Sequence, residues 1–247
     1  MKTSDVKSAG RVLAVFEAFA HACRPLSLSE VAHQLAIPVS SASGLLRTLE
    51  SNGYLYSLRP RGSYYPTRRI GEIANIVAAH DPILERARPL LAGLRDACEE
   101  TVVFSKRQGA RVVYLDIHES PHRIRFTAAP GELREMHANS VGKALLARLK
   151  PEERAALIEA MPFTPLTGRT LRTREALEAD IAASVARGWF INDGESVVDV
   201  FAFAVTLLIH DEPYGIAVAG PPHRMRPAAD RIVALLRQTA AAMEQSG

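Results

Sequence analysis

The first fifty residues of the chain alternate between apolar and polar positions with helical spacing. A first helix is predicted from apolar residues that recur three and four positions apart: Val12, Leu13, Val15, Phe16 and Phe19. A second helix should begin at Ser27, because a serine followed three residues later by a glutamate, here Glu30, forms a capping box. A third should begin after Pro38, where a missing N–H costs nothing, and end before Gly53.

The segment after the third helix predicts a two-stranded hairpin. Residues 54–56 and 64–65 have the aromatic character of strands, and residues 59–62 suit the tip between them. Two short helices with a tight break, followed by a glycine and a hairpin, are typical of a winged helix-turn-helix. Residues 70–79 then predict a linker helix, which residues 81–82, an Asp-Pro pair, should end.

From residue 82 onward, helical and strand patterns are mixed. Helices are predicted over residues 84–94, 141–149, 152–160, 174–187 and 225–243. Strands are predicted over residues 101–106, 111–118, 123–127, 189–191, 200–209 and 214–219. Hairpins outnumber regular βαβ units in this order, so we expect an α+β fold on an antiparallel sheet. The chain should therefore divide into residues 1–69, a linker helix over 70–81, and a second domain over 82–247.

Charge is distributed unevenly along the chain. Residues 1–70 contain nine lysines and arginines against four aspartates and glutamates, a net charge of +5, whereas all 247 residues together carry only +3. Residues 1–70 are thus basic and the rest of the chain is slightly acidic, which predicts that residues 1–70 alone bind a polyanionic partner. The two cysteines, Cys23 and Cys98, have neither metal-type nor redox-type spacing and suit a reducing compartment. Without a membrane-length apolar run or a signal-peptide pattern, we expect a cytoplasmic protein with no membrane partner.

Taken together, these segments resemble the isocitrate-lyase-regulator (IclR) family of bacterial transcription factors. The matching segments are residues 26–32, 37–41, 45–49, 53–54, 136–138, 142–147, 187–189, 195 and 220–221. The resemblance implies a winged helix followed by an effector-binding and oligomerisation domain with a GAF-like sheet. It also implies a homodimer or homotetramer on palindromic double-stranded DNA, a small-molecule effector, and no cofactor. The expected function is a ligand-responsive regulator, such as a repressor, of a catabolic operon.

The recognition helix should run from about residue 39 to residue 52. The candidates for DNA contact are Ser40, Ser41, Ser43 and Arg47 in this helix, with Arg59 and Arg61 at the predicted wing tip. The alternatives are that the serines only cap and solvate the helix, and that the two wing arginines lie on an ordinary solvated turn. Gly44 stands where the family usually has a larger, often basic residue, so it either allows close approach to DNA or removes one contact.

The resemblance also implies an effector pocket in the second domain. Its expected lining is Ile124, Phe126 and Thr127 on a strand, Asn139, Ser140 and Val141 at a helix start, and Asn192, Val200, Ala202, Ala217 and Ala219 on later strands. Backbone amides at the helix start can hold a carboxylate. Relatives that bind small carboxylates have polar side chains where this chain has three alanines, so we expect a partly apolar or aromatic carboxylate. Alternatively, neighbouring side chains such as Phe126, Phe201 or Phe203 fill the space and no ligand binds.

Other residues raise the question of metal binding or catalysis. His118, His122 and His137 lack the cysteines or carboxylates that would complete a metal site, so we expect structural histidines. Lys143 lacks a Walker pattern around it and should be a surface lysine at a helix start. An enzyme using Lys143, His137 or Cys98 would need a nucleophile, a base and an orienting group at recognisable spacing, which the sequence does not offer. The other alternative is an architectural DNA-binding protein without an effector.

Overall fold

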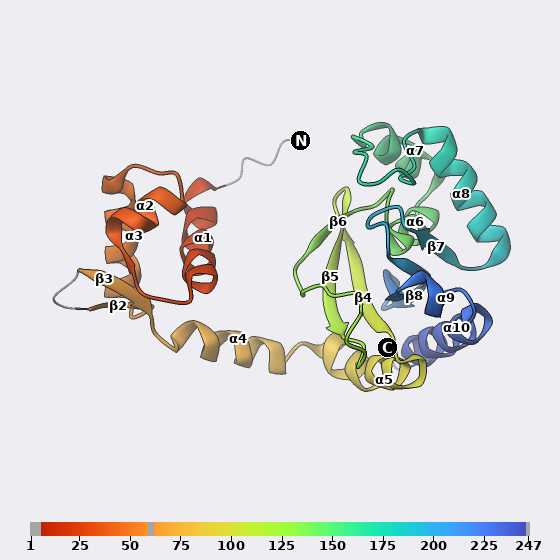
Figure 1. The fold of residues 1–247 in the computed structure, drawn as a ribbon, viewed down its shortest axis with the longest axis horizontal. Helices are drawn as coiled ribbons and strands as arrows, with labels where there is room; N and C mark the ends of the chain where they lie inside the picture. The colour runs from red at the N-terminus through yellow and green to blue at the C-terminus, as the bar shows by residue number, and fades with distance from the viewer. Residues whose placement is uncertain (1–5, 59–61, 246–247) are drawn as a thin grey trace. The chain divides into compact units, whose positions relative to one another are not determined.

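The computed structural model describes residues 6–58 and 62–245. Its contacts divide the chain into two compact units, Met1–Asp81 and Pro82–Gly247, which we call the N-terminal unit and the C-terminal unit (Figure 1). Each unit combines helices with antiparallel strands, which is the α+β class that the sequence predicts. Within the described ranges, no helix has both the length and the apolar content needed to cross a membrane.

The N-terminal unit is a winged helix-turn-helix. Its helices are α1 (Lys7–Ala22), α2 (Leu28–Gln34), α3 (Val39–Ser51) and α4 (Arg69–Ala79), and its strands are β1 (Leu26–Ser27), β2 (Leu55–Leu58) and β3 (Ser63–Pro66). The three strands form an antiparallel sheet in the order β1-β3-β2. The predicted elements of this unit are confirmed, with α4 beginning one residue earlier than expected.

The start of α2 is fixed by the predicted capping box. The Glu30 amide donates to the Ser27 hydroxyl at 3.3 Å, and the Ser27 amide donates to Glu30 Oε2 at 2.8 Å. These two bonds satisfy amides that the first turn of a helix leaves without partners. The pKa of Glu30 is lowered to about 2, because the Ser27 amide and then the Arg24 guanidinium bind the charged carboxylate.

The C-terminal unit is built on a six-stranded sheet. Its strands are β4 (Thr101–Gln108), β5 (Arg111–His118), β6 (Leu133–Glu135), β7 (Phe190–Asp193), β8 (Phe201–Ile209) and β9 (Glu212–Gly220). Its helices are α5 (Pro82–Cys98), α6 (Ser140–Ala147), α7 (Pro151–Glu159), α8 (Arg174–Arg187), α9 (Pro222–Met225) and α10 (Ala229–Gln245). The strand order is β6-β5-β4-β9-β8-β7, and every neighbouring pair is antiparallel.

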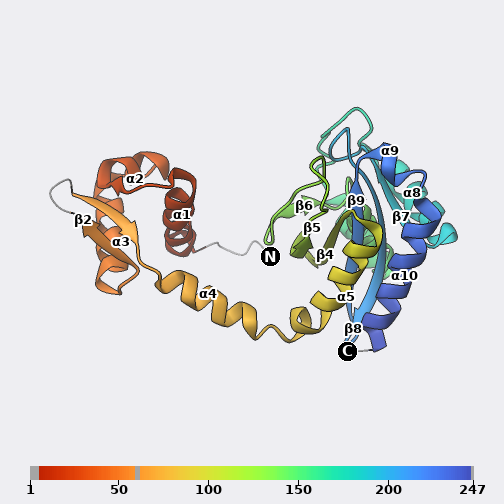
Figure 2. The same cartoon turned by 60° about the horizontal axis from the view of Figure 1, so that its bottom comes forward.

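Helices cover both faces of this sheet. Helices α5 and α10 pack on one face over a core that includes Leu91, Phe104 and Leu236, and Figure 2 shows them lying along that side of the strands. On the other face α6, α7 and α8 enclose a second core, which includes Leu145 and Leu177. Alternate residues of each central strand therefore face different helices, as the pleat of a strand requires.

The structure corrects the prediction of a strand over residues 123–127. This segment is irregular, and the edge strand that pairs with β5 is β6. Side chains, not a neighbouring strand, satisfy its backbone. The Thr101 hydroxyl donates to the Phe126 carbonyl at 2.6 Å, and Arg224 Nη2 donates to the Ile124 carbonyl at 2.9 Å. Ile124 itself is 73% exposed, so the apolar residues of this segment do not form the buried face of a strand.

The predicted closing helix over residues 225–243 is also corrected. It is divided into α9 and α10 by a turn at residues 226–228. Pro227 lies in this turn, and a proline removes a backbone donor and clashes with the preceding helical turn. The long second part, α10, supplies the buried apolar residues of this segment, including Ile232 and Leu236.

Candidate functional site

Helix α3 presents one polar face and one apolar face. Ala42, Leu46 and Leu49 are buried and anchor the helix to the N-terminal unit. Ser40 and Arg47 are exposed, and their spacing of seven residues places them on the same side of the helix. A helix anchored by an apolar stripe and exposing hydroxyl and guanidinium donors has the form that enters a DNA major groove.

The remaining expected DNA contacts surround this face. Ser41 and Ser43 are half-buried on α3. Gly44 is not required by packing, because a Cβ added there would meet nothing within 4 Å. Its open position leaves a small gap on the helix surface beside Arg47, which lies three residues further on. Arg59 and Arg61 lie outside the described residues.

A small cavity of about 20 Å³ lies in the C-terminal unit between the sheet and the start of α6. Its lining is Val103, Tyr114, Phe126, Asn139, Ser140, Val141, Asn192, Ser196, Val200, Ala202, Ala217 and Ala219. Nine of the eleven residues expected for the effector pocket therefore meet around one space. The two others, Ile124 and Thr127, do not line it and are exposed, because the irregular segment turns only Phe126 inward.

Val103, Tyr114 and Ser196 line the cavity but were missed at the sequence level. For Tyr114, strand alternation carried the signal, because Val112 and Tyr114 share the β5 face that packs toward α6. Ser196 lies in a turn after β7, and turns have no periodicity from which to deduce which side chains point inward.

Hydrogen bonds among the lining residues determine which polar groups can meet a ligand. Asn139 Oδ1 accepts from the Val141 amide at 2.9 Å, and Asn139 Nδ2 donates to the Tyr114 hydroxyl at 2.8 Å. Asn192 is likewise occupied, since its Nδ2 donates to the Ala138 carbonyl and the Ser196 hydroxyl and its Oδ1 accepts from an amide. The side-chain amides of Asn139 and Asn192 therefore hold the cavity walls in place.

The hydroxyl groups around the cavity have donor capacity to spare. The oxygens of Tyr114 and Ser196 each accept a hydrogen from an asparagine, and among the described residues their own hydrogens meet no acceptor. Burial raises the pKa of Tyr114, so the phenol keeps its proton and remains a donor. The cavity thus combines hydroxyl donors with an apolar wall that includes Val200, Ala217 and Ala219.

Lys143 is not the surface residue that the sequence predicts. Its side chain is fully buried, and its Nζ donates to Glu195 Oε1 at 2.8 Å and to Oε2 at 3.0 Å, with Asp180 Oδ2 at 2.9 Å. Burial raises the pKa of Glu195, and the Lys143 ammonium opposes that rise. The preceding residue, Gly142, packs directly against the chain, because a Cβ there would lie 2.3 Å from the Met136 carbonyl oxygen. Residues 140–146 of α6 are all buried, so this part of the helix, Lys143 included, is enclosed on every side.

His137 and Cys98, two of the residues considered for catalysis, make packing and backbone contacts. His137 Nε2 lies 3.1 Å from the Thr164 carbonyl, and its ring packs against Phe163. Cys98, the last residue of α5, is buried in the core, and burial raises the pKa of its thiol, which is the reverse of activation. Across residues 6–58 and 62–245, no group of three or more histidine, cysteine or acidic side chains is arranged to hold a metal ion.

Family models match both units of the chain. The helix-turn-helix domain of IclR proteins matches residues 8–59, and the C-terminal domain of bacterial IclR regulators matches residues 76–245. The HTH-type transcriptional regulator BhcR of Paracoccus denitrificans is 29% identical over 205 residues, which are 82% of this chain and 74% of that protein. The transcriptional repressor IclR of Escherichia coli is 26% identical over 227 residues, 90% of this chain and 83% of that repressor.

Solved structures show the same fold. A putative transcriptional regulator from Rhodococcus is similar with a TM-score of 0.81 and 27% identity, covering 97% of both chains. An IclR homolog from Microbacterium hydrocarbonoxydans, solved in complex with 4-hydroxybenzoate, has a TM-score of 0.79 at 20% identity, covering 96% of this chain and 98% of that one. With two family models covering the DNA-binding and C-terminal regions, the chain belongs to the IclR family of bacterial transcriptional regulators.

Proposed function

We propose that this regulator binds a palindromic DNA operator as a homo-oligomer and changes its DNA affinity when a partly apolar carboxylate enters the cavity of the C-terminal unit. The observation that carries the proposal is that nine residues expected for the effector pocket line one cavity. The chain that contains this cavity belongs to a family of transcriptional regulators. The winged helix supplies the DNA-binding part, with Ser40, Ser41, Ser43 and Arg47 of α3 and with Arg59 and Arg61 as its proposed contacts.

The chemistry of the cavity supports an acid with an apolar body. Hydroxyl donors such as Tyr114 suit a carboxylate, and the methyl groups of Ala202, Ala217 and Ala219 suit a ring or an alkyl chain. The related Microbacterium protein was solved with 4-hydroxybenzoate, a molecule of this class. A small hydrophilic acid would face methyl groups with its polar atoms, losing water without replacement at a cost of about 1–3 kcal/mol.

The cavity must expand to admit such a ligand. Its volume of about 20 Å³ is room for about one water molecule. Phe126 is the lining residue best placed to move, because it lies on an irregular segment rather than in the sheet ladder. We propose that an aromatic acid displaces the Phe126 ring, and that the change reaches the DNA-binding unit through the segment that joins the two units.

Homo-oligomer formation is supported by the apolar surface of α4. None of its residues is buried within the described chain, and Ile73, Ile76 and Val77 are 41%, 63% and 67% exposed. Large apolar side chains grouped on one helix are typical of a protein–protein contact. A second copy of α4 is the proposed cover, because a two-fold dimer presents the two recognition helices that a palindrome needs.

The test is a selection from random DNA duplexes with the full chain, followed by anisotropy titrations of the enriched duplex with and without added acids. The proposal expects a two-fold symmetric sequence and an affinity that changes with an aromatic acid. Thermal shift gives the second measurement, since a ligand that binds only the folded state raises the melting temperature. DNA binding that no acid alters, with no acid raising the melting temperature, would favour an architectural protein instead.

A further inference from the structure

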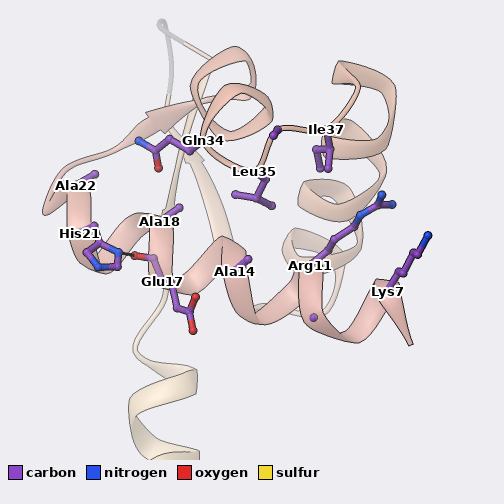
Figure 3. Close-up of a pocket in the computed structure, with 12 residues that line it drawn as sticks. Lys7, Arg11, Ala14, Glu17, Ala18, His21, Ala22, Gln34, Leu35 and Ile37 are labelled. Atoms are coloured by element: carbon purple, nitrogen blue, oxygen red, sulfur yellow. Dashed lines mark hydrogen bonds between the residues drawn. The ribbon is translucent and has the colours of Figure 1, made fainter. Parts of the chain in front are cut away.

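An open groove of about 790 Å³ runs along α1 of the N-terminal unit. Figure 3 shows Lys7 and Arg11 toward one end of the helix and Glu17 toward the other. Because charges of both signs line this open surface, the groove selects neither an anion nor a cation. The cavity of the C-terminal unit is different, since one of its walls is a chain segment with defined contacts.

That wall is the irregular segment of residues 119–127, which contributes Phe126 to the lining of the cavity. Ser120 anchors the beginning of the segment, because its hydroxyl donates to the Glu99 carbonyl at 2.6 Å. Further along, the backbone carbonyls of Ile124 and Phe126 accept hydrogen bonds from side chains outside the segment. The position of the Phe126 ring therefore depends on side-chain bonds and not on a strand ladder.

Arg224, on α9, supplies one of these bonds. Its Nη2 donates to the Ile124 carbonyl at 2.9 Å and to Glu100 Oε2 at 2.9 Å, and its Nε also bonds the Glu100 carboxylate. Glu100 is 3% exposed and lies against Gly220, where the structure has no room for a Cβ. The buried carboxylate thus fixes the direction in which the guanidinium faces the segment.

Thr101 supplies the second bond. Its hydroxyl donates to the Phe126 carbonyl at 2.6 Å and accepts from the Ser120 amide at 3.1 Å, so one buried side chain joins both ends of the segment. Thr101 itself pairs with Ala219, which lines the cavity. The backbone that carries the Phe126 ring is therefore fastened directly to the sheet.

We propose that Arg224 and Thr101 are positioning residues that hold Phe126 in the cavity and so set how readily an aromatic acid enters. The inference rests on the proposed function and adds the residues that control access to its site. A ligand that binds only the open segment has an apparent affinity reduced in proportion to the open fraction. Removing a bond made only in the closed segment raises that fraction, so binding should become tighter and faster.

Arg224→Gln in the full chain tests this effect, because it shortens the side chain and removes Nη2. Calorimetry and stopped-flow mixing with benzoate should show affinity and association rate both increased about tenfold. Loss of a positive charge alone would weaken binding of an anion, so the sign of the change separates the two causes. The matched control is Arg123→Gln, which removes an exposed arginine of the same segment and should not increase affinity. Unchanged or weaker benzoate binding in Arg224→Gln would overturn the proposal.

Phe126→Ala separates control of access from a direct effect on the ligand. This truncation makes room without moving the segment, so adding Arg224→Gln should then give no further gain in benzoate affinity. An equal gain with and without the Phe126 ring would overturn the proposal. Thr101→Val, which removes the second bond at nearly constant volume, should also increase affinity and provides a variant that leaves the buried Glu100 pair intact.

Trypsin measures the opening of the segment without any ligand, because Arg123 and Arg125 are exposed cleavage sites within it. Cleavage of a folded protein requires local opening, so mass spectrometry should detect cutting at these two sites about tenfold faster in Arg224→Gln. The control, Arg172→Gln, changes an exposed arginine elsewhere in the unit and should be cut at the wild-type rate. Equal rates in Arg224→Gln and wild type would overturn the hold of Arg224 on the segment. Faster cutting without binding of any acid would refute the proposed function and leave that hold standing.

Discussion

Lys143 Nζ lies 2.8 Å from Glu195 Oε1, and the lysine side chain is completely buried. The pair joins α6, whose first turn lines the cavity, to the turn after β7. The same turn is held by Asn192, whose Oδ1 accepts the Glu195 amide at 2.9 Å, and by Thr170, whose hydroxyl donates to the Glu195 carbonyl at 2.6 Å. Two walls of the cavity are thus positioned through one buried ion pair.

Breaking this pair should destabilise the protein strongly. Lys143→Met removes the ammonium and leaves Glu195 as a buried carboxylate without its main partner, at an expected cost of about 3–5 kcal/mol of unfolding free energy. Urea unfolding of the variant measures the loss, with Lys150→Met, an exposed lysine, as the matched control. Adding Glu195→Gln to Lys143→Met should recover part of the stability. A loss in Lys143→Met no larger than in the control would contradict the role of the pair.

The destabilisation should depend on pH. Burial raises the pKa of Glu195 above its ordinary value, and Lys143 opposes the rise. A raised carboxyl pKa contributes stability that is present below the unfolded value and is lost as pH rises through the folded value. Without the ammonium the pKa should rise further. The stability gap between wild type and Lys143→Met should therefore widen as pH rises above the ordinary glutamate pKa of about 4.3. A gap that narrows over this range would show that Glu195 is not the group left unpaired.

Arg47 should contribute directly to operator binding. Arg47→Ala should weaken binding to the selected duplex by about 1–3 kcal/mol if the guanidinium contacts a base edge. Anisotropy at fixed salt provides the measurement. Arg172→Ala, an exposed arginine of the C-terminal unit, is the control and should leave the affinity unchanged. Equal affinities of wild type and Arg47→Ala would remove this residue from the DNA contact.

The predicted wing tip should contribute to DNA binding through charge alone. Replacing Arg59 and Arg61 together by alanine should reduce the slope of log K against log salt by roughly one unit for each phosphate that the wing no longer neutralises. Sequence preference among duplexes should change little, because phosphate contacts carry no base information. A slope identical to that of the wild type would mean that these two arginines do not contact DNA.

Ligand preference should follow the alanine wall of the cavity. Calorimetry with a panel of aromatic acids, compared with glyoxylate and pyruvate, should give tighter binding of the aromatic acids because only they bury apolar area against Ala202, Ala217 and Ala219. Tight binding of only the small acids would refute the argument from these alanines. Binding by neither set would favour a cavity filled by the chain's own side chains.

The Tyr114 hydroxyl should hold the acidic end of that ligand. Tyr114→Phe removes the donor and leaves one Asn139 N–H without its partner, so binding of the best aromatic acid should weaken about tenfold or more. Tyr56→Phe, on the N-terminal unit, is the matched control, because this tyrosine is exposed and does not belong to the lining set. Unchanged affinity in Tyr114→Phe would place the carboxylate elsewhere in the cavity.

Local sequence signals determined most of the architecture. Periodicity, the Ser27 capping box and Gly53 were sufficient for the winged helix, because each acts over a few neighbouring residues. The antiparallel α+β class followed from hairpin turns for the same reason. The family resemblance then identified nine residues that the fold brings around one cavity, although they are scattered from Phe126 to Ala219 along the chain.

Only tertiary structure decided the features that depend on distant partners. Residues 123–127 have a strand-like pattern, yet their carbonyls are satisfied by Thr101 and Arg224 and no strand forms. Lys143 resembles a surface residue because its partner, Glu195, lies 52 positions away in the sequence. Burial and pairing between residues that are far apart in the chain leave no periodic pattern in the local sequence. They emerge only when close packing brings the partners together and excludes water from them.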